Sequence, residues 1–62
     1  MKRRDFILHL KKYHCFLVRE GANHSIFRNV KNNQVSTVPR HNEIDNFLCK
    51  KICKDLGVPR IK

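Results

Sequence analysis

The sequence has no tryptophan, two glycines, two prolines and five acidic residues. With so few glycines it shows no glycine-rich phosphate-binding loop, and its scattered acidic residues show no carboxylate pair for general acid and base catalysis. A Ser-His-Asp set is not evident either. Hydrolase mechanisms that depend on these devices are therefore not expected. Its aromatic residues, one tyrosine and four phenylalanines, predict a small hydrophobic core.

Long hydrophobic runs are also missing. The basic start of the chain is followed by Asp5 and by residues 6–8, a run far too short for the apolar part of a signal peptide. No stretch of the sequence is long and apolar enough to span a bilayer. We therefore expect a cytoplasmic protein that has no membrane partner.

Cysteine is scarce, and its three positions lack the spacing of a disulfide framework. An odd number of cysteines fits reduced thiols in a cytoplasm. Cys49 and Cys53 could ligate zinc with Cys15 and His14, but three residues between two helical cysteines is not a usual zinc-ligand spacing. We expect Cys49 and Cys53 to pack in the core or at its edge, and we expect no metal and no other cofactor.

Positive charge dominates what the sequence does contain. The 62 residues include 14 Lys and Arg against 5 Asp and Glu, which gives a net charge of +9. A chain of this length predicts one domain, residues 1–62, near the lower size limit for an unsupported hydrophobic core. So much positive charge on so small a surface favours a polyanionic partner, with nucleic acid first.

The first part of the chain predicts one helix and three strands. Phe6, Leu10 and Tyr13 recur at spacings of four and three, which indicates an amphipathic helix over residues 2–13. The residues that follow are β-branched and aromatic without a helical period, and turn residues separate them into short strands. These strands are expected at residues 15–19, 24–29 and 34–39, with turns at 21–23 and 30–33.

A second helix is predicted at the end of the chain. Asn42 is a good N-cap, and Asp45 three residues later completes a variant of the capping box. Gly57 is the expected residue after the helix, and Pro59 prevents its continuation. The apolar face of this helix is expected to contain Ile44, Phe47, Leu48, Ile52 and Leu56.

The predicted order is α-β-β-β-α, which places the chain in the α+β class. Two amphipathic helices must bury their apolar faces, and a three-stranded antiparallel sheet can offer them one face. The other face of the sheet then stays open. Double-stranded RNA-binding domains use this layered arrangement.

His24 is the first candidate for chemistry, because a Gly-Ala-Asn turn delivers it to the start of the second strand. Histidine is the side chain that most readily takes and gives a proton near neutral pH. Strand alternation places His24, Ile26 and Arg28 on one face and Ser25 and Phe27 on the other, and the sequence does not decide which face is buried. If Phe27 points into the core, His24 and Arg28 stand together on the open face.

A histidine can cleave RNA without a metal, by taking the proton of the 2′-hydroxyl or by protonating the departing 5′-oxygen while cations stabilise the developing charge. His41 is a candidate for a second proton-transfer group, ahead of Tyr13, His14 and His9. Each of these residues can equally be an exposed side chain without a role. The residues expected to bind RNA are Lys11, Lys12, Arg19, Arg28, Arg40 and His41.

Several segments together resemble a known family. They are the basic start at residues 1–5, the Glu-Gly-Ala-Asn-His-Ser-Ile-Phe segment at 20–27, the Thr-Val-Pro-Arg-His segment at 37–41 and the helix at 43–59. Over essentially the whole chain, they resemble the HicA toxins of bacterial type II toxin-antitoxin systems. Many members have Gly-Ser-His at the turn, where this chain has Ala22 and Asn23 before the histidine.

The resemblance implies an α-β-β-β-α fold like that of a double-stranded RNA-binding domain, and an mRNA interferase activity that cleaves transcripts and halts translation. It places the single functional histidine of the family at His24. It also implies a HicB antitoxin as partner, which is expected to cover the histidine face. The oligomeric state of the free toxin does not follow from the resemblance.

Two other functions are compatible with the residues alone. A non-catalytic module that binds RNA or DNA would use the same basic surface to recognise shape and phosphates. A small adaptor for an acidic protein would also be basic, but would have no RNA affinity at physiological salt.

Overall fold

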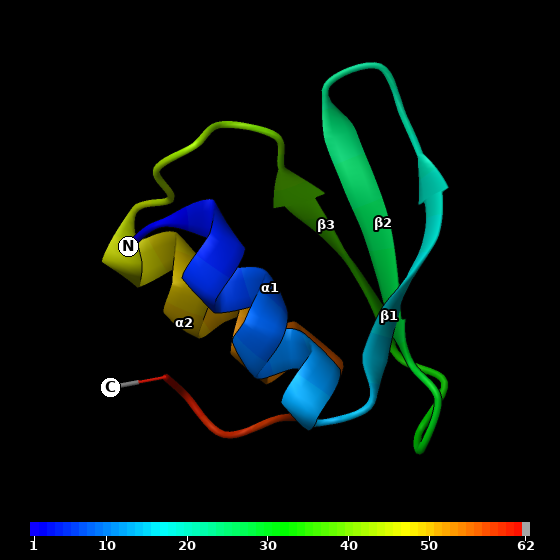
Figure 1. Cartoon of the computed structure of the whole chain (residues 1–62). Coiled ribbons are helices and arrows are strands. Elements are labelled where there is room, and N and C mark those ends of the chain that lie inside the picture. The colour runs from blue at the N-terminus through cyan, green and yellow to red at the C-terminus, as the bar shows by residue number, and fades with distance from the viewer. Residues whose placement is uncertain (62) are drawn as a thin grey trace.

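The computed structural model describes residues 1–61. The elements are α1 (Arg3–Lys12), β1 (Cys15–Glu20), β2 (His24–Asn29), β3 (Val35–Pro39) and α2 (Asn46–Leu56). The three strands form one antiparallel sheet in the order β1-β2-β3. Both helices lie on the same side of this sheet, and its other side is uncovered (Figure 1). The predicted α+β class and element order are confirmed.

Strand pairing determines which side chains share the uncovered side of the sheet. Arg28 on β2 faces Phe16 on β1 and Val35 on β3, and directly paired residues of antiparallel strands share a face. Between Leu17 and Arg19 the register shifts, so Val18 is an extra residue in β1 and the pairing resumes with Arg19 opposite Ile26. The uncovered face therefore combines arginines with apolar side chains.

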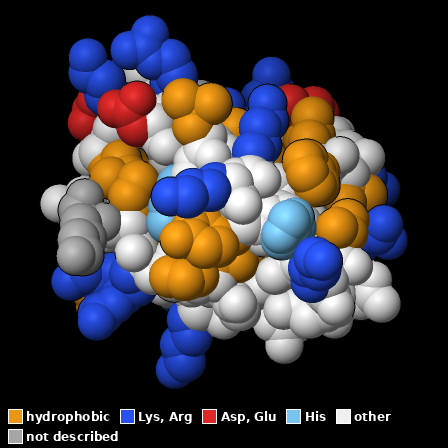
Figure 2. Space-filling view, turned by 60° about the horizontal axis from the view of Figure 1, so that its bottom comes forward, with side chains coloured by type: hydrophobic (Ala, Val, Ile, Leu, Met, Phe, Trp, Pro, Cys, Tyr) orange, Lys and Arg blue, Asp and Glu red, His pale blue; other side chains and the backbone are white. Residues whose placement is uncertain are grey.

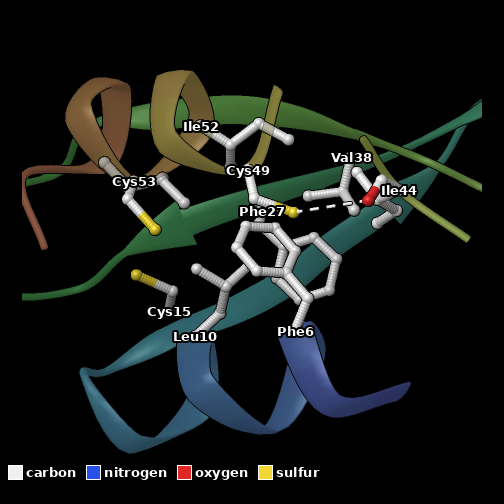
Figure 3. Close-up of a cluster of buried hydrophobic side chains, with 10 residues drawn as sticks. Phe6, Leu10, Cys15, Phe27, Val38, Ile44, Cys49, Ile52 and Cys53 are labelled. Carbon is white, nitrogen blue, oxygen red and sulfur yellow. Dashed lines mark hydrogen bonds between the residues drawn. The ribbon is translucent and has the colours of Figure 1, made fainter. Parts of the chain in front are cut away.

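The core lies between the helices and the sheet (Figure 3). Phe6 and Leu10 enter it from α1, and Phe27 enters it from the middle strand. The other buried apolar residues are Cys15, Val38, Ile44, Cys49, Ile52, Cys53 and Leu56. All three cysteines are buried in the core, which confirms the packing predicted for Cys49 and Cys53.

Burial also changes the chemistry of these thiols. It raises the pKa of Cys15, Cys49 and Cys53 above the ordinary value, because an apolar environment disfavours the thiolate. In Figure 3 the sulfur atoms of Cys15 and Cys53 point toward each other across the core. Neutral buried thiols are poor nucleophiles, so these cysteines serve packing.

The start of the second helix differs from the prediction. Asp45, rather than Asn42, is the N-cap of α2, and neither α1 nor α2 has a side-chain hydrogen bond at its cap. Instead of capping, Asn42 accepts a hydrogen bond from Arg3 N through its carbonyl oxygen at 2.8 Å, and Ile44 N donates to Met1 O at 2.8 Å. Because these backbone groups pair with the N-terminus, residues 42–44 form a short extended connection instead of a first helical turn.

The predicted apolar face of α2 was wrong at Phe47, a residue that is 76% exposed. Only one side of an α-helix, with its 3.6 residues per turn, can face the core. In α2 that side carries Cys49, Ile52, Cys53 and Leu56. Phe47 lies on the opposite side. The other element limits differ from those predicted by one residue at an end: α1 is shorter at each end, β1 is longer, and β3 begins later.

Neither of the two described helices has the length and apolarity that crossing a bilayer requires.

Candidate functional site

A small pocket forms where β2 begins beside the end of β3. These two strand ends are at the top of the sheet in Figure 1. His24 is opposite Pro39 in the sheet register, and the turn before it closes through a hydrogen bond of 2.7 Å from Gly21 N to His24 O. The pocket has a volume of about 440 Å³ and is lined by Ala22, Asn23, His24, Pro39, Arg40 and His41. Its shape is therefore determined by the β1–β2 turn and the segment that leaves β3.

The buried face of β2 decides the orientation of His24. Phe27 is 3% exposed and Ser25 is fully buried, whereas His24 and Arg28 are exposed. Because Phe27 points into the core, His24 and Arg28 share the uncovered face of the sheet. The imidazole is accessible to a ligand that approaches this face.

Arg40 is held beside the turn that carries His24. Its Nη1 donates to Gly21 O at 3.3 Å, and its Nε lies 3.8 Å from Glu20 Oε1. Both side chains of this ion pair are about half exposed, so the pair contributes little to stability. The ion pair does orient the Arg40 guanidinium at the rim of the pocket. A guanidinium can bind phosphate oxygens in a bidentate manner.

A partly buried hydrogen-bond network supports the pocket from the helix side. Arg3 of α1 donates through Nε to Pro39 O at 2.8 Å and through Nη2 to Ser25 Oγ at 2.9 Å. Ser25 Oγ in turn donates to Glu20 Oε1 at 2.6 Å. The network thus joins α1, β1, β2 and the end of β3 directly behind His24.

Sequence reasoning missed Arg3 and Ser25 as residues that position the site. Arg3 lies 22 residues from Ser25 and 36 from Pro39 along the chain. No local spacing or motif signals an arginine that bridges elements so far apart. Only the packing of α1 against the sheet brings these groups together.

Replacing Arg3 with lysine is expected to lower the free energy of unfolding by about 1–3 kcal/mol, because one ammonium group cannot reproduce the two-directional guanidinium contact with Pro39 O and Ser25 Oγ. Urea unfolding followed by circular dichroism measures this change. The matched control is Arg4→Lys, the same substitution at the next, exposed position of α1. Equal stability of the two variants would contradict the importance of the network.

The structure brings together some of the residues predicted to bind RNA. Arg40 and His41 line the His24 pocket. Arg19 and Arg28 lie on the same face of the sheet, but Arg28 is four residues from His24, which is about 13 Å along an extended strand. These two arginines can therefore contact a ligand that extends from the pocket across the sheet.

Lys11 and Lys12 are not brought to the pocket. They are exposed at the C-terminal end of α1, which lies on the helix side of the sheet, and Lys12 Nζ is 5.7 Å from the centre of the Tyr13 ring. Among the candidates for a second proton-transfer group, His41 is the one in the pocket. His9 is bonded through Nε2 to Pro59 O at 2.7 Å, outside the pocket.

Positive charge surrounds the molecule on more than one side. Figure 2 shows Lys and Arg side chains projecting around the edge of one face, with acidic side chains at two places near its top. Among residues 1–61, no group of three or more His, Cys, Asp and Glu side chains is arranged to hold a metal ion. What the pocket offers is an accessible imidazole beside an oriented guanidinium, an arrangement suited to proton transfer at a phosphodiester.

A family model described as "HicA toxin of bacterial toxin-antitoxin" matches residues 3–58 of the chain. The match extends from the first residue of α1 to beyond α2 and includes every strand. Neither a curated protein nor a solved structure matches the chain.

Proposed function

The chain belongs to the HicA toxin family, and from this premise we propose that it is a metal-independent endoribonuclease that cleaves messenger RNA at the His24 pocket. As a member of the family, it is the toxin of a toxin-antitoxin system, and the family implies a HicB antitoxin as its partner. Cleavage of transcripts would inhibit translation, which places the proposed activity in the cytoplasm. The observation that carries the proposal is the exposed imidazole of His24 beside Arg40 in one pocket.

In the proposed reaction, the 2′-oxygen of a ribose attacks the adjacent phosphorus, and the bond from phosphorus to the 5′-oxygen breaks. His24 acts as general base toward the 2′-hydroxyl proton or as general acid toward the departing 5′-oxygen, a role that typically contributes about 10²–10⁴-fold to a rate. Arg40 stabilises the negative charge that develops on the phosphorane oxygens. His41 contacts the RNA at the same pocket.

The proposed substrate path continues from the pocket over the uncovered sheet face. Arg28 and Arg19 are exposed there, and both are available to phosphates of an RNA that extends from the pocket across the sheet. Phe16 and Ile26 lie in the same rows of the sheet as these arginines, and an aromatic ring on such a face can stack on an unpaired base. An antitoxin that covers this face would block both the imidazole and the path.

The chemical ends of the products test this mechanism. End-labelled single-stranded RNA should be cut to a 2′,3′-cyclic phosphate and a 5′-hydroxyl, at the same rate in excess chelator, because the attacking oxygen belongs to the substrate and no metal takes part. Mass spectrometry of the fragments identifies the ends. The matched control is the same RNA with 2′-O-methyl groups, which should remain intact. Products with 3′-hydroxyl ends, or loss of cleavage in chelator, would overturn the mechanism.

A further inference from the structure

A second basic surface lies on the outer side of α2, away from the His24 pocket. An open groove of about 560 Å³ is lined by Phe47, Lys50, Lys51, Lys54 and Arg60. Every residue that lines it is exposed, and four of the five are cationic. The pocket mechanism uses none of them.

The groove and the His24 pocket are on opposite layers of the molecule. The side of α2 that carries Cys49, Ile52, Cys53 and Leu56 packs toward the sheet, and Phe47 and Lys54 lie on the side that faces outward. His24 is on the other face of that same sheet, because Ser25 and Phe27 of β2 are buried and His24 is exposed. A macromolecule bound over His24 therefore leaves the groove accessible.

The composition of the groove identifies its ligand chemically. Lys50 and Lys54 are one helical turn apart, about 6 Å along the axis, so their charges are adjacent on the surface. Lys51 is partly neutralised by Asp55, whose Oδ2 lies 3.6 Å from its Nζ. An exposed aromatic ring next to cations that form no ion pair among residues 1–61 suits a polyanion whose backbone contacts the charges and whose bases stack on the ring.

We propose that this groove is a second RNA-binding surface, which holds single-stranded RNA through phosphate contacts with Lys50, Lys54 and Arg60 and through stacking of a base on Phe47. The proposed ribonuclease activity supports RNA as the choice of polyanion, but the groove does not depend on the His24 chemistry. A long RNA held here has a raised effective concentration at the His24 pocket. The groove therefore lowers KM for long substrates without changing kcat.

Binding by fluorescence anisotropy tests the groove in the His24→Ala background, where a labelled RNA stays intact. Lys54→Gln should reduce the slope of log affinity against log salt concentration by about 0.7, the value for one phosphate contact with a single strand. Phe47→Ala should weaken binding by about fivefold or more, since stacking on one base is worth about 1–3 kcal/mol. Phe47→Leu should weaken binding similarly, because leucine retains apolar bulk but lacks the ring.

The matched control is Lys31→Gln, which removes the same charge from the exposed β2–β3 turn. If Lys54→Gln and Lys31→Gln have equal effects, or if Phe47→Ala leaves affinity unchanged, the groove is not an RNA-binding surface. In the cleavage-competent protein, Lys54→Gln should raise KM for a long RNA and leave a short oligonucleotide unaffected. If Lys54→Gln changes KM equally for the long RNA and the short oligonucleotide, the inference is overturned. If the unsubstituted protein does not cleave RNA at all, the proposed function is overturned instead.

Discussion

Replacement of His24 with alanine is expected to lower kcat for RNA cleavage by about 10²–10⁴-fold and to leave RNA affinity nearly unchanged. The imidazole is exposed and makes no side-chain hydrogen bond to the described part of the protein, so its removal should not disturb the fold. The phosphate contacts predicted for Arg40, Arg28 and Arg19 remain in the variant. Single-turnover cleavage and anisotropy binding on the same RNA separate these two effects.

An asparagine substitution provides a matched comparison at another exposed histidine. His14 joins α1 to β1 with a φ of 69°, a conformation that asparagine tolerates better than alanine. His14→Asn should therefore cleave RNA like the unsubstituted protein, and His24→Asn should be as inactive as His24→Ala. If the His24 variants retain the cleavage rate, cleavage does not use this histidine. If the unsubstituted protein and the variants bind RNA equally and none of them cleaves it, the non-catalytic RNA-binding module becomes the better hypothesis.

Replacement of Phe6 with alanine is expected to lower the free energy of unfolding by about 3–5 kcal/mol, because the lost ring leaves a cavity in a close-packed core. Phe6 is fully buried, and its ring lies beside that of Phe27 (Figure 3). A domain of this size rarely has more than about 3–5 kcal/mol of stability in total. The variant should therefore be largely unfolded at room temperature and inactive, although His24 is unchanged.

Phe47→Ala is the matched control for Phe6→Ala, since it deletes the same ring from the exposed side of α2. Its free energy of unfolding should stay within about 0.5 kcal/mol of the unsubstituted protein. Urea unfolding measures both variants. A comparable loss of stability in the two would mean that Phe47 is buried in solution. A partner that binds only the folded toxin, such as its antitoxin, should partly restore folding of the Phe6 variant by mass action.

The residues of the candidate pocket were predicted in part. The turn and the strand alternation single out His24, because both are local properties of a few residues. The segment that contains His41 is part of the resemblance to the HicA family. Lys11 and Lys12, which were predicted to bind RNA, lie at the end of α1 and away from the pocket. Charge alone does not show which layer a residue occupies. Arg3 and Ser25 were not found, because their contact requires the packed positions of α1 and β2.

The start of α2 illustrates the same limit. Asn42 and Asp45 have the spacing of a variant capping box, which is a local signal for a helix start. In the protein, pairing of residues 42–44 with residues 1–3 satisfies those backbone groups instead and delays the helix to Asn46. Tertiary hydrogen bonds thus outweigh a local capping preference.

The sequence by itself determined the order of helices and strands, the two apolar helix faces in outline, the strong positive charge and the family. These depend on periodicity, composition and local motifs, which neighbouring residues specify. Only the tertiary structure decided that Phe27 rather than Ile26 is buried, and therefore that His24 faces away from the helices. Both residues are apolar, so their alternation is equally compatible with either face, and only packing against Phe6 and the rest of the core distinguishes them.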